Sequence, residues 1–214
     1  MKRAKLLQKM VETGIIAVIR SETPAKALKT VEALVAGGIT GIELTFSVPH
    51  ASRVIEQVVD RYEGTNVVVG AGTVLDVTSA RLAIMAGAKF IVSPTFSKEV
   101  AFLCNLYQVP YVPGVYTPNE AQQALEYGAE LVKLFPGKLA GPMVIDEFHG
   151  PFPYLNVMPS GGVNVANLVD WFAAGAKVVA VGGDLLEPAK HDDYAAVTAK
   201  ATEYIAKWRE WQQN

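Results

Sequence analysis

Short apolar runs alternate with segments of helical periodicity along most of the chain. Residues 15–19 are all apolar, as expected for a strand that is buried on both faces. In residues 21–38 the apolar positions recur at helical spacing, with Pro24 suited to the first turn and Gly37-Gly38 at the end. Such an alternation of strand and helix predicts an α/β fold with parallel strands.

The alternation continues through eight strand–helix units. Strands are predicted at residues 15–19, 41–46, 66–70, 89–93, 109–113, 130–137, 155–159 and 177–181. After a short lead helix at 2–11, helices are predicted at 21–38, 49–62, 76–87, 97–107, 141–148, 164–174 and 193–211. A further helix begins at Thr117, which has the capping-box spacing to Glu120.

This pattern predicts a single (β/α)8 TIM barrel that spans residues 1–214, preceded by the lead helix. A doubly wound open sheet is the alternative, and the absence of a Gly-x-Gly-x-x-Gly motif after the first strand disfavours it.

Composition narrows the class of protein. Half of the 214 residues are hydrophobic, which is enough for a large core, and the net charge of -2 arises from mixed signs, so we expect no nucleic-acid partner. The single cysteine, Cys104, excludes an intrachain disulfide and is interpreted as a small buried hydrophobe. No apolar run reaches the ~18 residues of a membrane span, so the sequence predicts a soluble, cytoplasmic protein.

Lys133 lies in the predicted strand 130–137, where an apolar sequence rarely includes a lysine. Burying an ammonium is costly, and a neutral amine could attack a carbonyl carbon to form a Schiff base. The alternative is that Lys133 extends out at the strand end. Side chains alternate along a strand, so Glu43 and Lys133 are both expected to face the barrel axis, near the strand ends where barrel enzymes place their active groups.

Other candidates also follow strands. Arg20 could bind a carboxylate or phosphate, or form a surface ion pair. Thr73 follows two glycines and could contact a ligand, or cap the next helix. Glu43 could instead form a buried salt bridge with Lys133 that only compensates the two charges and has no catalytic role. Glycine-rich turns follow the seventh and eighth strands, at the loops where barrels bind phosphate; they could also be tight connections only.

Several motifs occur in order along the whole chain. They are Ile16-Ala17-Val18-Ile19-Arg20, Gly41-Ile42-Glu43-Leu44-Thr45, Gly70-Ala71-Gly72-Thr73-Val74, Ile91-Val92-Ser93-Pro94, Pro113-Gly114-Val115 with Thr117-Pro118, Lys133-Leu134-Phe135-Pro136, Gly150-Pro151-Phe152-Pro153 and Pro159-Ser160-Gly161-Gly162. Together they closely resemble the 2-keto-3-deoxy-6-phosphogluconate (KDPG) aldolase family, which includes 4-hydroxy-2-oxoglutarate (KHG) aldolases. The resemblance implies a class I aldolase, a homotrimeric barrel that needs no metal or other cofactor.

The resemblance also implies roles for individual residues. Lys133 is expected to form the Schiff base and Glu43 to act as general acid and base. Substrate contacts are expected from Arg20, Thr73, Pro94, Phe135 and Ser160. Phosphate contacts are expected from Gly161, Gly162, Gly182 and Gly183.

Two positions depart from the pattern. Some members of the family have an arginine four residues after the glutamate, where this chain has Ser47. Members often have a serine after the eighth strand, where this chain has Asp184, whose carboxylate would repel a phosphate unless it points away and caps the following turn.

The predicted reaction is cleavage of KDPG, a small-molecule 2-keto acid, to pyruvate and glyceraldehyde 3-phosphate. KHG and the galactonate epimer of KDPG are alternative substrates. A barrel isomerase or decarboxylase without a covalent intermediate, or a non-catalytic binding barrel, is a weaker alternative.

Overall fold

The computed structural model describes residues 1–213, and its strands form two parallel sheets. The first has the order β5-β4-β3-β2-β1-β9, and the second β6-β7-β8. The strands are β1 (Ile15–Ile19), β2 (Gly41–Thr45), β3 (Val68–Gly72), β4 (Ile91–Val92), β5 (Tyr111–Val112), β6 (Gly114–Val115), β7 (Val132–Leu134), β8 (Val157–Pro159) and β9 (Val179–Val181).

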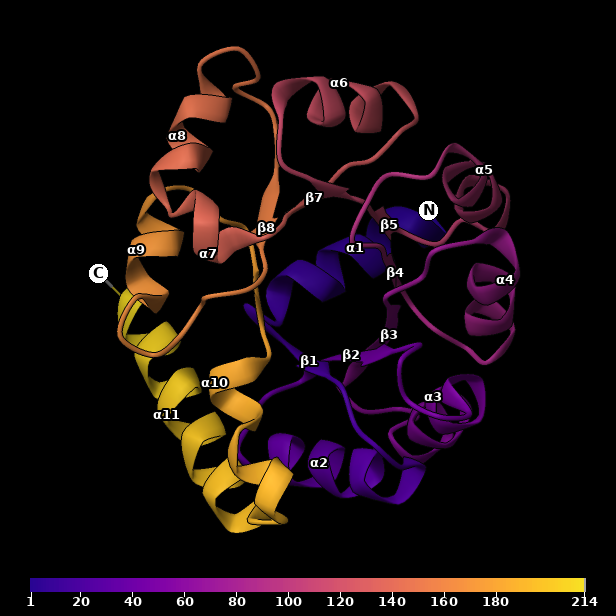
Figure 1. Ribbon diagram of the computed structural model, residues 1–214, viewed down its shortest axis with the longest axis vertical. Coiled ribbons are helices and arrows are strands. Elements are labelled where there is room, and N and C mark those ends of the chain that lie inside the picture. Colours follow the sequence, from indigo (N-terminus) through magenta and orange to yellow (C-terminus); the bar gives the residue numbers. More distant parts are fainter. Residues whose placement is uncertain (214) are drawn as a thin grey trace.

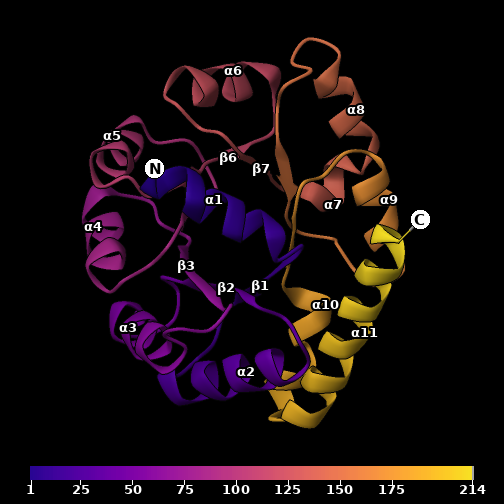
Figure 2. The same cartoon turned by 180° about the vertical axis from the view of Figure 1, so that it is seen from behind.

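Helices surround the strands, and one helix crosses the middle of the ring (Figure 1). The outer helices are α2 (Pro24–Ala36), α3 (Ala51–Arg61), α4 (Val77–Met85), α5 (Lys98–Tyr107), α6 (Pro118–Glu126), α7 (Gly137–Ala140), α8 (Met143–His149), α9 (Leu168–Ala173), α10 (Gly183–Leu186) and α11 (Tyr194–Gln212), with a short 3-10 turn at Pro188–His191. The crossing helix is α1 (Lys2–Glu12), which Figure 2 shows lying over one end of the strands. In the described part of the chain, no helix is both long and apolar enough to cross a membrane.

The predicted α/β fold with parallel strands is confirmed, whereas the predicted closed eight-stranded barrel is present only in part. Of the fifth predicted strand, 109–113, only β5 forms. An unpredicted strand, β6, follows Pro113 and belongs to the other sheet. Proline has no N–H group to donate to a ladder. The second sheet is joined to the first by a bridge between Ser160 and Ala180 and by a hydrogen bond from the N–H of Lys177 to the carbonyl oxygen of Val157.

The third strand lies two residues later than predicted, at β3 rather than 66–70. Gly70 and Gly72 lie in this strand because neighbouring side chains occupy the space that a Cβ at either position would need. A Cβ on Gly70 would lie 2.3 Å from the ring of Phe90, and a Cβ on Gly72 would lie 1.8 Å from Glu43 Oε1. Tertiary packing here overrides the low strand propensity of glycine.

Helix boundaries follow local capping where the sequence supplies a cap. Thr23 caps α2 with Pro24 in its first turn, and the capping box of Thr117 and Glu120 is present at α6. The predicted helix 141–148 is present as α8, and a further short helix, α7, precedes it where the sequence predicted none. The helix predicted from 164 begins only at Leu168, because Asn164 and Asn167 bond to each other's backbone N–H in a turn.

Two hydrophobic clusters lie on opposite faces of the strands. The larger cluster packs between strands and helices and includes Ile42, Leu44, Val132 and Leu134. The smaller cluster includes Leu131, and Met10 of α1 contributes to it. These placements agree with the alternation expected of β2 and β7. Cys104 is buried as predicted, and burial raises the pKa of its thiol to about 12.

Candidate active site

Glu43 and Lys133 are buried polar side chains on different sheets. Glu43 lies on β2 with no exposed surface, and Lys133 lies on β7 with 3% of its surface exposed. Glu43 pairs in register with Val18 and Gly70, and Lys133 pairs with Gly114 and Met158. The alternative in which Lys133 extends into solvent at the strand end is therefore wrong.

The carboxylate of Glu43 has no bonded partner among the described residues. Neither Oε1 nor Oε2 accepts a hydrogen bond, and no ion pair joins Glu43 to Lys133. The salt bridge considered from the sequence is therefore absent from residues 1–213. An unpaired buried carboxylate is costly, so it needs a functional explanation.

Burial and two nearby cations act in opposite directions on Glu43. Burial raises the pKa of its carboxyl group above the ordinary value, and the charges of Lys133 and Arg20 partly oppose that rise. A carboxyl group with a raised pKa holds its proton more tightly than an exposed one, which suits a group that must both accept and return a proton.

The amine of Lys133 lies against an aromatic ring that also lines the main cavity. Its Nζ is 4.9 Å from the centre of the Phe135 ring. Phe135 in turn contributes to a cavity of about 1240 Å³. The Phe135 ring thus lies next to both the amine of Lys133 and the cavity.

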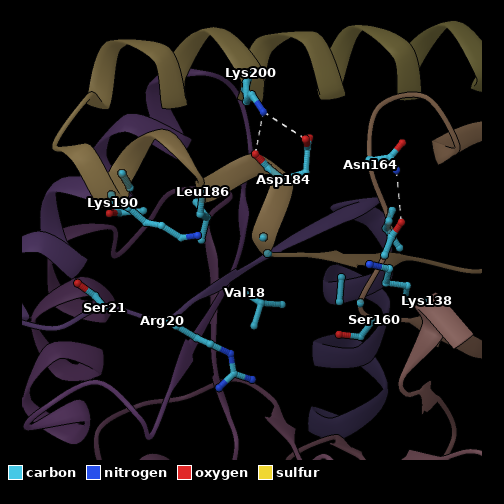
Figure 3. Close-up of a pocket in the computed structure, with 18 of the residues that line it drawn as sticks. Val18, Arg20, Ser21, Lys138, Ser160, Asn164, Asp184, Leu186, Lys190 and Lys200 are labelled. Carbon is cyan, nitrogen blue, oxygen red and sulfur yellow. Dashed lines mark hydrogen bonds and ion pairs between the residues drawn. The ribbon is translucent and has the colours of Figure 1, made fainter.

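Seven of the predicted site residues line this cavity, and Figure 3 labels two of them, Arg20 and Ser160. They are Arg20, Phe135, Ser160, Gly161, Gly162, Gly182 and Gly183. Lys133, Glu43, Thr73 and Pro94 are not among its lining residues. The cavity is rich in cationic side chains, since Lys26, Lys138, Lys190 and Lys200 also line it. Cationic side chains of this kind suit an anionic ligand.

Arg20 follows β1 and is exposed in the cavity wall. None of the ion pairs formed within residues 1–213 includes it, so the surface ion pair considered from the sequence is not found. Its guanidinium is available to a carboxylate or phosphate.

Thr73 and Pro94 follow β3 and β4, and neither lines the cavity. Thr73 has a φ of 55°, a left-handed conformation that is unusual for a β-branched residue. It does not cap α4, because Asp76 does so by accepting from the N–H of Ser79. The backbone of Pro94 packs against Gly114, where a Cβ would lie 2.1 Å from the Pro94 carbonyl oxygen.

Of the two glycine turns, only the first has a backbone conformation that other residues rarely adopt. Gly161 and Gly162 have φ values of 87° and 83°. A Cβ on Gly162 would lie 2.8 Å from the Cα of Lys138. Gly182 precedes α10, and a Cβ on Gly183 would meet nothing within 4 Å. These turns therefore present backbone to the cavity.

Asp184 follows this second turn, and it does not cap the turn as the sequence suggested. Its carboxylate accepts from Tyr204 Oη at 2.8 Å and from Lys200 Nζ at 3.2 Å, both on α11. Figure 3 shows Lys200 bonded to Asp184 at the edge of the cavity. Lys200 thereby balances the negative charge of Asp184 next to Gly182 and Gly183.

Several residues of this region have no clear signal in the sequence. Lys138, Asn164 and Lys190 line the cavity. Thr45, fully buried at the end of β2, bonds to the hydroxyl of Ser47. A lysine after a glycine-rich turn is a weak sequence signal, and no local pattern indicates the hydroxyl pair.

Comparison with known proteins gives a consistent result. The family model described as "KDPG and KHG aldolase" matches residues 6–200. A 2-dehydro-3-deoxy-phosphogluconate aldolase of Treponema pallidum (strain Nichols) is 36% identical over 189 residues, covering 86% of this chain and 89% of that protein. A 2-dehydro-3-deoxy-6-phosphogalactonate aldolase of Escherichia coli (strain K12) is 32% identical over 205 residues, covering 95% and 98%.

A solved structure extends the comparison. The KDPG aldolase of Legionella pneumophila, with pyruvate captured as a covalent carbinolamine intermediate, superposes with a TM-score of 0.82 at 28% identity. The match covers 91% of this chain and 95% of that chain.

Proposed function

This chain belongs to the KDPG and KHG aldolase family, and we propose that it is a class I aldolase whose preferred substrate is KDPG. The reaction releases pyruvate and glyceraldehyde 3-phosphate. One observation carries the assignment of the catalytic pair: Glu43 and Lys133 are both buried, and no ion pair joins them within the described residues. An amine and a carboxylate left unpaired in this way are available to a substrate.

Lys133 is the nucleophile. The lone pair of its Nζ attacks the C2 carbonyl carbon of the 2-keto acid to give a carbinolamine. The carboxyl group of Glu43 protonates the carbinolamine hydroxyl, which leaves as water, so that a protonated imine and the Glu43 carboxylate remain. This imine accepts the electron pair of the C3–C4 bond when that bond breaks. The ring of Phe135, 4.9 Å from Nζ, stabilises positive charge at this position through its π face.

Glu43 moves the protons. Its carboxylate takes the proton of the C4 hydroxyl as the C3–C4 bond breaks, so that an aldehyde leaves and the enamine of pyruvate remains. The resulting carboxylic acid then protonates C3, and water hydrolyses the imine to free Lys133 and pyruvate. Burial, which raises the pKa of Glu43, suits a group that must act as base and then as acid.

The cavity accounts for the phosphorylated end of the substrate. The N–H groups of Gly161, Gly162, Gly182 and Gly183 bind phosphate, and nearby lysines supply positive charge. Asp184 is compatible with a phosphate because Lys200 and Tyr204 hold its carboxylate. Arg20, Thr73, Pro94 and Ser160 contact the rest of the substrate. The galactonate epimer is a second candidate, because the Escherichia coli relative acts on it by name.

Reductive trapping tests the reaction type. Pyruvate with sodium borohydride should attach one three-carbon adduct to Lys133, located by peptide mass spectrometry. Lys133→Met should abolish trapping, whereas Lys177→Met, a change of an exposed lysine just before β9, should not. An unmodified Lys133 after full exposure would contradict the mechanism. A non-covalent isomerase, or a barrel that only binds ligands, gives no adduct.

We propose that the two sheets together form one (β/α)8 barrel spanning residues 1–214. Two observations support closure: only Pro113 separates β5 from β6, and the Ser160–Ala180 bridge joins β8 to β9. The carbonyl oxygen of Pro113 still accepts from the N–H of Lys133 at 2.8 Å.

We propose a cytoplasmic homotrimer. A three-fold ring needs two different complementary faces on each subunit. Exposed apolar side chains supply two such faces: Leu82 and Met85 of α4 with Phe102 and Leu106 of α5, and Leu139, Met143 and Tyr154. Equilibrium sedimentation measures the mass, and a purely monomeric protein would contradict this assembly.

A further inference from the structure

The ring of Phe90 lies next to Glu43 on the inner face of the strands. Phe90 directly precedes β4 and has no exposed surface. A Cβ on Gly70 would lie 2.3 Å from two carbons of this ring and 2.4 Å from a third. Gly70 pairs in register with Glu43 on the neighbouring strand, and paired strands lie about 5 Å apart. The ring therefore occupies the space beside Glu43 that a side chain at position 70 would fill.

The carboxylate of Glu43 lies one layer farther along the strands than this ring. Its Oε1 occupies the space next to Gly72, which lies two residues after Gly70 on the same face of β3. In the opposite direction, the smaller hydrophobic cluster joins Phe90 to Met10 of α1. This helix lies over that end of the strands (Figure 2). Apolar side chains thus fill the interior between Glu43 and α1.

Charged groups act on Glu43 from other directions. Lys133 of β7 and Arg20, which follows β1, lower the pKa of Glu43, and burial raises that pKa by more. Val18, its partner in register on β1, is apolar, as is Phe90. Both carboxylate oxygens lack a hydrogen bond among the described residues. A carboxylate without bonded partners is governed by the medium around it, so the exclusion of water on the side of Phe90 acts directly on its protonation.

We propose that Phe90 is a positioning residue of the reaction, whose ring keeps water from the carboxyl group of Glu43 and holds that group in the apolar surroundings in which it works as acid and base. Gly70 contributes because it leaves the space for the ring. Phe90 acts through Glu43 and does not line the cavity. The consequence for catalysis rests on the proposed aldolase function, whereas the effect on Glu43 does not.

Thermal unfolding across pH tests the effect on Glu43 without any turnover. Glu43→Gln removes the titration, so its Tm relative to the parent protein increases from pH 4.5 up to the raised pKa. Phe90→Ala opens a space beside two unpartnered oxygens, and water there lowers the pKa of Glu43. In the Phe90→Ala background the increase should therefore level off about one pH unit earlier. Phe90→Leu keeps more apolar contacts and should move this point in the same direction by less.

The pH profile of kcat/KM for KDPG tests the consequence for the reaction. The limb of the profile that reports Glu43 should move about one pH unit lower in Phe90→Ala. This direction is the same whether Glu43 acts as base or as acid, because either limb follows its pKa. Pyruvate trapping on Lys133 is measured separately. A shifted thermal profile without trapping contradicts the aldolase function and still supports the role of Phe90 toward Glu43.

Phe172→Ala is the matched control, because Phe172 is a buried phenylalanine of α9 that stacks on Trp211. It should lower Tm at every pH and leave both the effect of Glu43→Gln and the rate profile unchanged. Circular dichroism shows which variants are folded, and Phe90→Leu decides if Phe90→Ala is not. An unchanged thermal profile in the folded Phe90 variants overturns the proposal, and so does an equal shift in Phe172→Ala.

Discussion

Gly72 leaves the space that the carboxylate of Glu43 occupies. A Cβ on Gly72 would lie 1.8 Å from Glu43 Oε1 and 2.5 Å from its Cδ. The two residues lie on neighbouring strands, where Thr45 of β2 pairs in register with Gly72. A glycine is therefore needed at this point of β3 for the glutamate to lie where it does.

Gly72→Ala should displace Glu43 without changing any polar group. A shift of about 1 Å in a catalytic group can cost about 100-fold in rate, so kcat/KM should fall by that order. Crowding in a packed interior should also cost about 1–3 kcal/mol of stability. Steady-state kinetics and urea unfolding measure the two effects.

Gly150→Ala is the matched control, because its Cβ would be 3.4 Å from the nearest atom, the Glu147 carbonyl oxygen. It should leave kcat/KM unchanged. Wild-type activity in Gly72→Ala would show that the position of Glu43 is not critical.

Glu43→Gln should change how stability depends on pH. The folded state raises the pKa of Glu43 above its ordinary value of 4.5. At pH values between the ordinary pKa and the raised pKa, the folded protein keeps a proton on Glu43 that the unfolded chain has released. The free energy of unfolding therefore falls as pH rises through this window. Glutamine does not titrate, so the variant does not lose stability in this window. The Tm of Glu43→Gln relative to that of the wild type should therefore increase from about pH 4.5 upward.

Thermal scans across pH measure this effect, with Glu56→Gln, an exposed residue of α3, as the control. The same variant should lose aldol cleavage, because glutamine cannot accept the C4 proton. A constant Tm difference across the pH range would contradict the raised pKa.

Two substitutions of Thr73 test its backbone strain and the contribution of its hydroxyl to the reaction. Its φ of 55° is strained for threonine and alanine but not for glycine. The free energy of unfolding of Thr73→Gly should therefore exceed that of Thr73→Ala by about 1 kcal/mol. This net value already includes the larger backbone entropy that glycine loses on folding. Both remove the hydroxyl, so both should lower kcat/KM by a similar factor, roughly tenfold. Wild-type rates in both would remove Thr73 from the substrate contacts.

Removal of the Asp184 carboxylate should destabilise the protein more than removal of the Tyr204 hydroxyl. Asp184→Ala leaves the Tyr204 hydroxyl without its partner at a fully buried residue, which should cost about 1–3 kcal/mol. Tyr204→Phe should cost only about 1 kcal/mol, because Asp184 keeps Lys200.

The double variant should cost less than the sum of the single variants. Urea unfolding measures all three proteins. Additive values would show that the 2.8 Å contact carries no energy.

Much of the fold and part of the site could be predicted from local patterns. The apolar run at residues 15–19 is β1 without change, and the caps at Thr23 and Thr117 form because they depend only on neighbours in the chain. The alternation of side chains predicted Glu43 and Lys133 on the face opposite Leu44 and Leu134. These features require no knowledge of distant segments.

Tertiary structure alone decided the rest. The position of Glu43 depends on the missing side chain of Gly72, and the orientation of Asp184 depends on α11. Each partner lies on another strand or helix, and single residues carry no pattern that reports such contacts. The sequence by itself therefore determined which chemical groups this protein has and on which strands they lie. The packing of distant strands and helices decided their distances and protonation, because those depend on atoms that only the folded chain brings together.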